Sequence, residues 1–130
     1  MNDKVFLGGR VPNQELITFF GAADVFVTPS HVDGSSVSLM EAMACGLPTI
    51  ASDIPANAEW IAEGQTGWSF PDGDNHALAE LLLQIPSFDL PAVGTHARKV
   101  AEKRADWRRN KQLLFLCWEQ AMTSSKGGSL

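Results

Sequence analysis

The sequence predicts an α/β fold in which a parallel sheet is flanked by helices. Short apolar runs rich in β-branched residues alternate along the chain with segments of helical periodicity. Strands joined through helices pair in parallel with right-handed crossovers. With 130 residues, 45% of them hydrophobic, the chain can form one domain with its own core. We expect that domain over residues 1–122 and a disordered tail, rich in Ser, Lys and Gly, over residues 123–130.

The first third of the chain predicts a strand, a helix and a second strand. Residues 4–7 are a short apolar strand that a glycine pair ends. Asn13 can cap a helix over residues 13–21. Its buried face would consist of Leu16, Ile17, Phe19 and Phe20. Residues 24–29 form a β-branched run of the kind found in fully buried parallel strands.

The middle third predicts the central elements of the sheet. A helix follows the Ser-Ser pair and ends at Gly46, a natural C′ residue, because Pro48 prevents its continuation. We then expect a buried strand over residues 49–52, a short helix over residues 59–63 and a last strand over residues 68–70.

The final third is predicted to be helical. Asp74 can cap a helix that runs to Gln84 and buries leucine side chains. Residues 86–91 are expected to be a linker. Two helical segments follow, over residues 93–103 and 107–121.

Composition excludes several classes of protein. The net charge of −5 argues against nucleic acid as a partner. Cys45 and Cys117 lack the spacing of a metal or redox motif, and we interpret both as core cysteines in a reducing compartment. No apolar run approaches the ~20 residues of a membrane span. The tryptophans are interpreted as core residues: Trp60, Trp68, Trp107 and Trp118.

The segment from Asp33 to Gly46 has the residues that a sugar-nucleotide site needs. Asp33 precedes a Gly-Ser-Ser turn that opens into a helix. A helix start attracts phosphate because its N–H groups are unpaired and carry partial positive charge. Glu41 lies about 7–8 Å further along the helix axis. A diphosphate on the helix tip would have a carboxylate on each side, one for the hydroxyls of a sugar and one for those of a ribose.

The place of this turn in the predicted sheet supports a ligand site. The turn follows the carboxyl end of the strand over residues 24–29, where parallel sheets bind their ligands. The helical offset between Asp33 and Glu41 argues against a retaining glycosidase pair, whose carboxyl groups stand about 5–5.5 Å apart.

The motif as a whole resembles the donor-site signature of family-4 glycosyltransferases, which are retaining enzymes of the GT-B fold. An acid is followed after seven residues by Glu-Ala-Met-Ala-Cys-Gly-Leu-Pro. Further segments occur in the family's order and spacing: residues 5–8, 23–30, 48–53, 64–71 and 72–74. The resemblance implies a partial Rossmann-like sheet that corresponds to the later part of a GT-B C-terminal domain.

The resemblance also implies roles for individual residues. The counterpart of Glu41 binds the ribose hydroxyls. The counterpart of Asp33, Glu in most members, contacts the transferred sugar and makes Asp33 the candidate catalytic residue. Backbone N–H groups would bind the donor diphosphate at Gly34, Ser35, Ser36 and Val37. The backbone at Gly9 and Arg10 would border the nucleobase. Asp53 and Glu59 are interpreted as mainly structural, and His31 as an exposed loop histidine without a catalytic role.

A complete family member is about three times this length, with an acceptor domain and a basic pair that neutralises the leaving diphosphate. None of the basic residues here matches that pair. We therefore expect a cytoplasmic donor-site portion, peripheral to the inner membrane face in a full-length context. We expect it to bind a nucleotide-diphosphate sugar without metal or cofactor and to be inactive alone.

Two other interpretations stay open. The chain could be a non-catalytic α/β module that self-associates or docks with a partner through an exposed sheet edge. A third, less supported interpretation is another GT-B enzyme, such as an epimerase or a phosphorylase.

The predicted strand order leaves one strand edge unpaired. In doubly wound sheets the strand over residues 24–29 would have its neighbour on one side only, which is an association hazard. We expect either the strand over residues 4–7 or a second copy of the chain, in a homodimer, to cover this edge.

Overall fold

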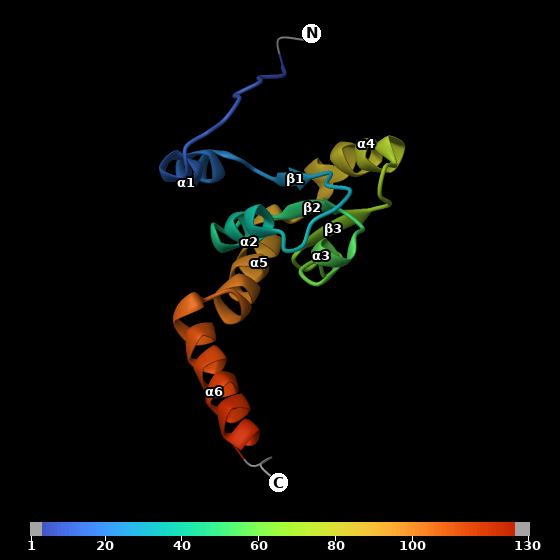
Figure 1. Ribbon diagram of the computed structural model, residues 1–130. Coiled ribbons are helices and arrows are strands. Elements are labelled where there is room, and N and C mark those ends of the chain that lie inside the picture. The colour runs from blue at the N-terminus through green and yellow to red at the C-terminus, as the bar shows by residue number, and fades with distance from the viewer. Residues whose placement is uncertain (1–3, 127–130) are drawn as a thin grey trace.

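Three parallel strands form the centre of the computed structural model, which describes residues 4–126 (Figure 1). The sheet has the order β1-β2-β3, with β1 at Phe26–Thr28, β2 at Thr49–Ser52 and β3 at Gly67–Phe70. All residues of β2 are buried, as expected for a central parallel strand. The predicted parallel α/β fold is confirmed.

Six α-helices and one short 3₁₀ helix are present in the part of the chain that the structure describes. They are α1 (Asn13–Ala22), α2 (Val37–Ala44), α3 (Pro55–Ala58), α4 (Asn75–Gln84), η1 (Ile85–Ser87), α5 (Leu90–Arg104) and α6 (Trp107–Lys126).

The sheet buries an apolar cluster on each face because successive strand residues point to opposite sides. On one face, Leu39 and Met43 of α2 pack against Ala97 and Ala101 of α5, next to Phe26 of β1. The other cluster is centred on Ile50, Trp68, Phe70 and Val93, and α4 packs on it. Helix α5 contributes Ala97 and Ala101 to the first cluster and Val93 to the second, and therefore connects the two faces of the sheet.

Several local signals predicted their elements correctly. Gly46 has a left-handed backbone (φ 81°) directly after α2, as the predicted C′ residue should. Asp74 caps α4 by accepting a hydrogen bond from the Ala77 N–H at 2.9 Å. The strands at 49–52 and 67–70 match the prediction within one residue.

The predicted strand over residues 4–7 is wrong. This segment is extended but pairs with no strand among residues 4–126, and the side chains of Phe6 and Leu7 are 84% and 75% exposed. Apolar residues favour a strand only where a neighbour can take their hydrogen bonds. β1 therefore lies at an edge of the sheet, as expected, without the cover that this segment was predicted to supply.

Two helix starts also differ from the prediction. The short helix after β2 spans α3, four residues earlier than residues 59–63, because Pro55 favours the first helical position. Asn13 is the first residue of α1 and Pro12 takes the cap position, so Asn13 does not cap the helix. Ile17 and Phe19 of α1 are exposed rather than buried.

The C-terminal part is more helical than predicted. Asp89 caps α5, which begins at Leu90 inside the expected linker. α6 extends to Lys126 and away from the sheet (Figure 1), so residues 123–126 of the expected tail are helical. Residues 127–130 lie outside the described part of the chain.

The predicted burial of several side chains is wrong. Cys45 and Cys117 are both exposed, as are Trp107 and Trp118, whereas Trp68 is buried. Three of these exposed side chains lie on or at the start of α6, which stands away from the core. Within residues 4–126, no helix combines the length and the apolar character that crossing a bilayer requires.

Candidate functional site

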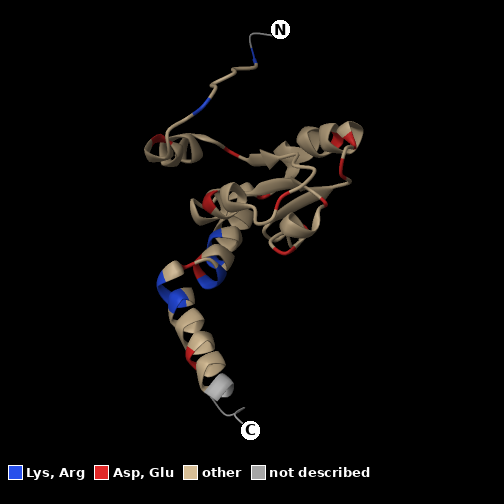
Figure 2. Cartoon of the chain, in the orientation of Figure 1, with Lys and Arg blue, Asp and Glu red and all other residues tan. Residues whose placement is uncertain are grey.

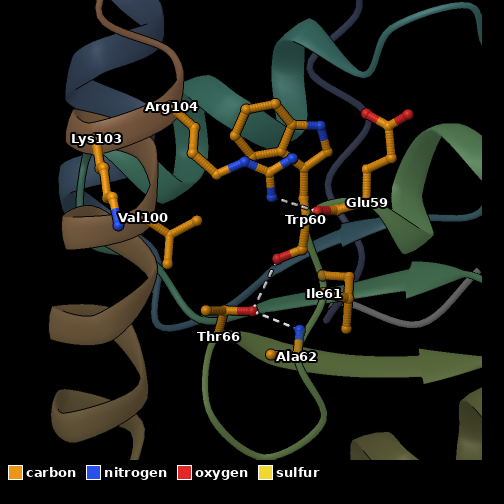
Figure 3. A pocket seen from close by; sticks show the side chains of 8 residues that line it. All are labelled: Glu59, Trp60, Ile61, Ala62, Thr66, Val100, Lys103 and Arg104. Carbon is orange, nitrogen blue, oxygen red and sulfur yellow. Dashed lines mark hydrogen bonds between the residues drawn. The ribbon is translucent and has the colours of Figure 1, made fainter.

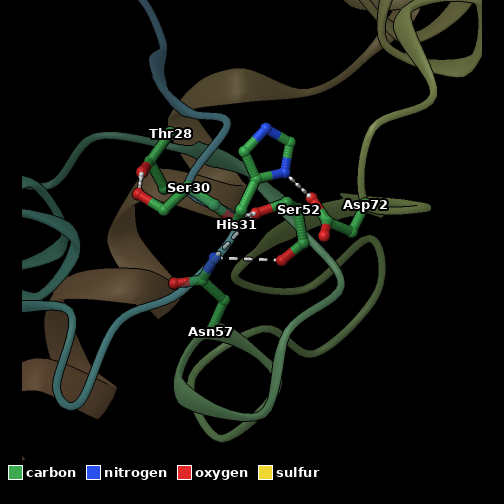
Figure 4. A network of polar contacts seen from close by, with 6 residues as sticks. All are labelled: Thr28, Ser30, His31, Ser52, Asn57 and Asp72. Carbon is green, nitrogen blue, oxygen red and sulfur yellow. Dashed lines mark hydrogen bonds and ion pairs between the residues drawn. The ribbon is translucent and has the colours of Figure 1, made fainter.

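The carboxyl ends of the three strands meet at one edge of the sheet, where the loops that follow them contact one another (Figure 4). The Ser52 hydroxyl at the end of β2 donates to the carbonyl oxygen of Ser30, 2.5 Å away. His31 Nδ1 lies 2.6 Å from Asp72 Oδ1 and so joins the loop after β1 to the loop after β3. These contacts fix the loop that leads from β1 to Asp33 against the ends of the other two strands.

Asp33 organises that turn with both of its carboxylate oxygens. Oδ1 accepts a hydrogen bond from the Ser35 N–H at 3.0 Å, and Oδ2 lies 3.2 Å from the Ser36 hydroxyl. An Asp that bonds to the backbone two residues on forms an Asx turn. At Gly34, added side-chain volume would meet no atom within 4 Å, so the space in front of the turn is open.

Helix α2 begins at this turn without a side-chain cap. Ser36 occupies the cap position but makes no cap hydrogen bond. Its side chain is buried, and its hydroxyl donates to Oδ1 of Asn57. The first N–H groups of α2 therefore receive no cap from Ser36. Of the N–H groups predicted to bind phosphate, that of Ser35 donates to Asp33 and that of Val37 to the Ser35 carbonyl oxygen at 2.8 Å. The next two, of Ser38 and Leu39, form no hydrogen bond among the described residues and carry the partial positive charge of a helix start. Such a helix start can bind an anion.

Glu41 points out of α2 beside a hollow. It is exposed, whereas its neighbours Leu39, Ala42 and Met43 are buried, so its position in an apolar run reflects the helical period. The hollow of about 250 Å³ lies between α1 and α2. It is lined by Asn13, Leu16, Ile17, Phe20, Glu41, Ala44 and Cys45. An apolar wall with one carboxylate suits the flat face and the hydroxyls of a nucleoside.

Gly9 and Arg10 lie in the extended segment before α1. Gly9 has a left-handed backbone (φ 63°), and both residues are exposed. Within residues 4–126, no hydrogen bond or ion pair joins either of them to α2. The structure thus brings the turn and Glu41 together on one helix but does not bring these two residues to them.

A second hollow, of about 260 Å³, lies where α5 meets the loop after α3 (Figure 3). The Arg104 guanidinium lies 4.4 Å from the ring centre of Trp60 and donates to the Glu59 carbonyl oxygen at 2.5 Å. The Thr66 hydroxyl donates to the Trp60 carbonyl oxygen and accepts from the Ala62 N–H. Because Arg104 and Thr66 bond to backbone groups of the same hollow, we interpret it as a structural contact between α5 and this loop.

Sequence reasoning missed two residues of the site. Asn57 is buried beneath the turn, and Asp72 pairs with His31. A single Asn after a short strand carries no pattern that distinguishes a buried amide from a loop residue. The α1 side chains of the first hollow were predicted only as the buried face of a helix.

Comparison with known sequences identifies relatives of the whole segment. A sequence model of the family described as "Glycosyl transferases group 1" matches residues 1–112. The putative colanic acid biosynthesis glycosyltransferase WcaL of Salmonella typhimurium is 34% identical over 126 residues, 89% of this chain and 31% of WcaL. The amylovoran biosynthesis glycosyltransferase AmsK of Erwinia amylovora is 38% identical over 91 residues, 65% of this chain and 22% of AmsK. The chain therefore spans less than a third of the length of these relatives.

Solved structures share the fold. Sucrose-phosphate synthase from Thermosynechococcus elongatus superposes with a TM-score of 0.86 at 26% identity, over 94% of this chain and 31% of that enzyme. HepE of Anabaena, solved in complex with UDP-glucose, has a TM-score of 0.72 at 21% identity, over 78% of this chain and 29% of HepE. The expected Rossmann-like fold of a GT-B domain is confirmed.

Proposed function

Since this chain belongs to the group 1 glycosyl transferases, we propose that it forms the donor site of an enzyme that transfers a sugar from a nucleotide-diphosphate sugar to an acceptor. One observation carries the proposal: the uncapped start of α2 faces open space, with Asp33 before it and Glu41 one turn inside the helix. In the proposed reaction the sugar retains its anomeric configuration, as the spacing of the two acids resembles the retaining signature.

The diphosphate would rest on the turn over residues 33–37. The N–H groups of Ser38 and Leu39 at the start of α2 can donate to its oxygens, and the helix dipole favours its negative charge. Ser35 is exposed and can present its hydroxyl, whereas Ser36 is buried and can contribute only its backbone. The absence of a side chain at Gly34 lets the phosphate approach the backbone closely.

Asp33 would contact the transferred sugar. A carboxylate can accept about four hydrogen bonds. The turn uses one, at Oδ1, from the Ser35 N–H, and the Ser36 hydroxyl lies 3.2 Å from Oδ2. The remaining acceptor positions are available to sugar hydroxyls, in a geometry that the turn itself holds in place.

The nucleoside would occupy the hollow between α1 and α2. Glu41 can accept hydrogen bonds from both ribose hydroxyls, which point the same way on the ring. Leu16 and Phe20 provide half-buried apolar surface for the ring faces. Structures of the same fold contain UDP and UDP-glucose, which supports a nucleotide sugar as the class of ligand.

We propose that this chain alone does not catalyse sugar transfer. Among residues 4–126, no Lys or Arg forms a hydrogen bond or ion pair with the turn. The developing charge of a leaving diphosphate would therefore lack a side-chain cation, which removes a large electrostatic contribution to catalysis. We expect the chain to bind the donor without transferring its sugar.

The two exposed cysteines allow a direct test of donor binding. Cys45 lines the proposed nucleoside hollow and Cys117 lies on α6. Alkylation with iodoacetamide, followed by mass spectrometry, measures each thiol separately. Saturating UDP, GDP or ADP should slow the modification of Cys45 several-fold and leave Cys117 unchanged. The nucleotide that protects best identifies the preferred base.

Two variants show whether protection comes from this site. Glu41→Ala should abolish the protection of Cys45 because the ribose loses its acceptor. The matched control Glu80→Ala, an exposed acid on α4, should retain it. Equal alkylation rates with and without every nucleotide, from folded protein, would contradict the proposed donor site.

We also propose that a second copy of the chain covers the open edge of β1. β1 pairs only with β2, and an unpaired strand edge is a template for association.

A further inference from the structure

A chain of hydrogen bonds joins Asn57, Ser52 and Ser30 where the strands end (Figure 4). Asn57 Nδ2 donates to the Ser52 carbonyl oxygen at 2.9 Å and to the Ser52 hydroxyl at 3.3 Å. The Ser52 hydroxyl in turn donates to the Ser30 carbonyl oxygen. On its other side, Asn57 Oδ1 accepts from the hydroxyl of Ser36. This network links the ends of β1 and β2 to the first residue before α2.

The orientation of the Asn57 amide follows from this pattern. Asn57 is 1% exposed, so each of its polar atoms needs a partner within the protein. The Ser52 carbonyl oxygen can only accept, so Nδ2 faces Ser52 and Oδ1 faces Ser36. The amide therefore offers Ser36 an acceptor and no donor.

This acceptor explains why Ser36 does not cap α2. A serine at the cap position ordinarily accepts a hydrogen bond from an N–H of the first turn. Here the hydroxyl points inward to Asn57, and no side-chain cap forms. The Val37 N–H donates to the Ser35 carbonyl oxygen, but no hydrogen bond among the described residues engages the N–H groups of Ser38 and Leu39, which stay available for another acceptor.

The same arrangement affects Asp33. The Ser36 hydroxyl has one proton and two acceptors within reach, Asn57 Oδ1 and Asp33 Oδ2. When the Ser36 hydroxyl donates to Asn57 Oδ1, Asp33 Oδ2 can accept from another donor, such as a hydroxyl of the bound sugar.

We propose that Asn57 is a positioning residue for donor binding, because it holds the Ser36 hydroxyl beneath the turn and so keeps the start of α2 uncapped for the diphosphate. The inference rests on the proposed function for the identity of the ligand. The hydrogen-bonding part of it is testable in the protein without ligand.

The first test compares amide hydrogen exchange in the unliganded protein. In Asn57→Ala the Ser36 hydroxyl loses its inward acceptor and should turn to cap α2. Exchange at Ser38 and Leu39 should then slow several-fold relative to wild type. In the double variant Ser36→Ala/Asn57→Ala no hydroxyl is present, and exchange should be fast again. Unchanged exchange in Asn57→Ala would overturn the proposal.

The second test measures the Kd of the nucleotide that binds best, by isothermal titration. Asn57→Ala should weaken binding about tenfold, the equivalent of one hydrogen bond to a charged group. The double variant should recover part of this loss, because the competing cap is gone. A merely structural role of Asn57 predicts the opposite, namely a double variant at least as weak as Asn57→Ala.

Two outcomes of these tests, a wild type that binds no nucleotide and a variant that does not fold, are treated separately. If wild type binds none of the three nucleotides, the proposed function fails, and the exchange experiment still decides whether Asn57 keeps α2 uncapped. If Asn57→Ala does not fold, Asn57→Ser replaces it in both tests. Serine lacks the amide oxygen that accepts from the Ser36 hydroxyl in the wild type, so the same exchange pattern is expected.

Discussion

The carboxylate of Asp33 has a structural task besides the proposed catalytic one. It accepts a hydrogen bond from the Ser35 N–H, lies 3.2 Å from the Ser36 hydroxyl, and so shapes the turn from which α2 begins. A family member with Glu at this position would place its carboxylate about one methylene further from the backbone. The shorter Asp reaches its own turn, and we infer that the sugar must approach it more closely.

We expect Asp33→Ala to destabilise the fold modestly. The Ser35 N–H loses its acceptor, which should lower the free energy of unfolding by about 1 kcal/mol. Urea denaturation followed by tryptophan fluorescence measures this change, since Trp68 is buried. The control is Asp53→Ala, whose carboxylate forms no hydrogen bond within the described residues and is exposed. An equal loss in both variants would show that the turn does not depend on Asp33.

At the scale of elements, helix α5 holds the two layers together through close contact with the end of α2. A Cβ added at Gly94 would lie 2.1 Å from the carbonyl oxygen of Gly46 and 3.3 Å from Pro48 Cδ. Only a residue without a side chain permits this approach. The left-handed turn at Gly46 that ends α2 therefore also provides the surface on which α5 packs.

Gly94→Ala should consequently separate α5 from α2. The overlap is with backbone atoms, which cannot move aside easily, so we expect a loss of about 1–3 kcal/mol in the free energy of unfolding. Thermal denaturation by circular dichroism provides the measurement. Gly21→Ala on α1 is the matched control, because its Cβ meets no atom within 4 Å. That substitution should leave stability unchanged or raise it by up to about 1 kcal/mol.

At the scale of the whole molecule, charge is strongly separated along the chain. Residues 98–130 contain eight of the ten basic residues and three of the fifteen acidic ones, so they carry +5 and the first 97 residues carry −10. Figure 2 shows the basic residues gathered on the later part of α5 and the start of α6. The proposed donor site thus lies in the acidic part, where binding of an anionic ligand depends on local N–H groups rather than on net charge.

Association through the edge of β1 is the prediction at this scale. Sedimentation velocity should show a sedimentation coefficient that rises with concentration, and amide exchange over residues 25–28 should slow in parallel. The exposed apolar face of α6 offers a second route to association. The double variant Leu114→Glu/Trp118→Glu blocks that route and should not affect a dimer formed through β1.

The salt dependence of association distinguishes pairing at β1 from contact between the acidic and basic parts of the chain. Backbone pairing at β1 should change little with salt, whereas a contact between the acidic and basic parts should weaken as salt screens it. A chain that stays monomeric at about millimolar concentration, with unchanged exchange at β1, would contradict the proposal that a second copy covers this edge.

The sequence by itself determined the elements whose signals are local. Gly46 and Asp74 set helix boundaries through a left-handed backbone and a capping side chain, and both properties belong to the residue and its immediate neighbours. The buried strand at 49–52 was predictable because its β-branched character fits a central strand. The turn at Asp33 and the position of Glu41 on one helix follow from spacing alone.

Only the tertiary structure decided the features that depend on a distant partner. Residues 4–7 have strand-like composition but no neighbouring strand to bond. Trp118 and Cys117 are as apolar as core residues, yet α6 extends away from the core and leaves them exposed. Asn57 takes its importance from Ser36, 21 residues earlier in the chain. Burial, and hydrogen bonds between residues far apart in the sequence, depend on which segments come together in the fold. The sequence pattern of one segment alone therefore cannot predict them.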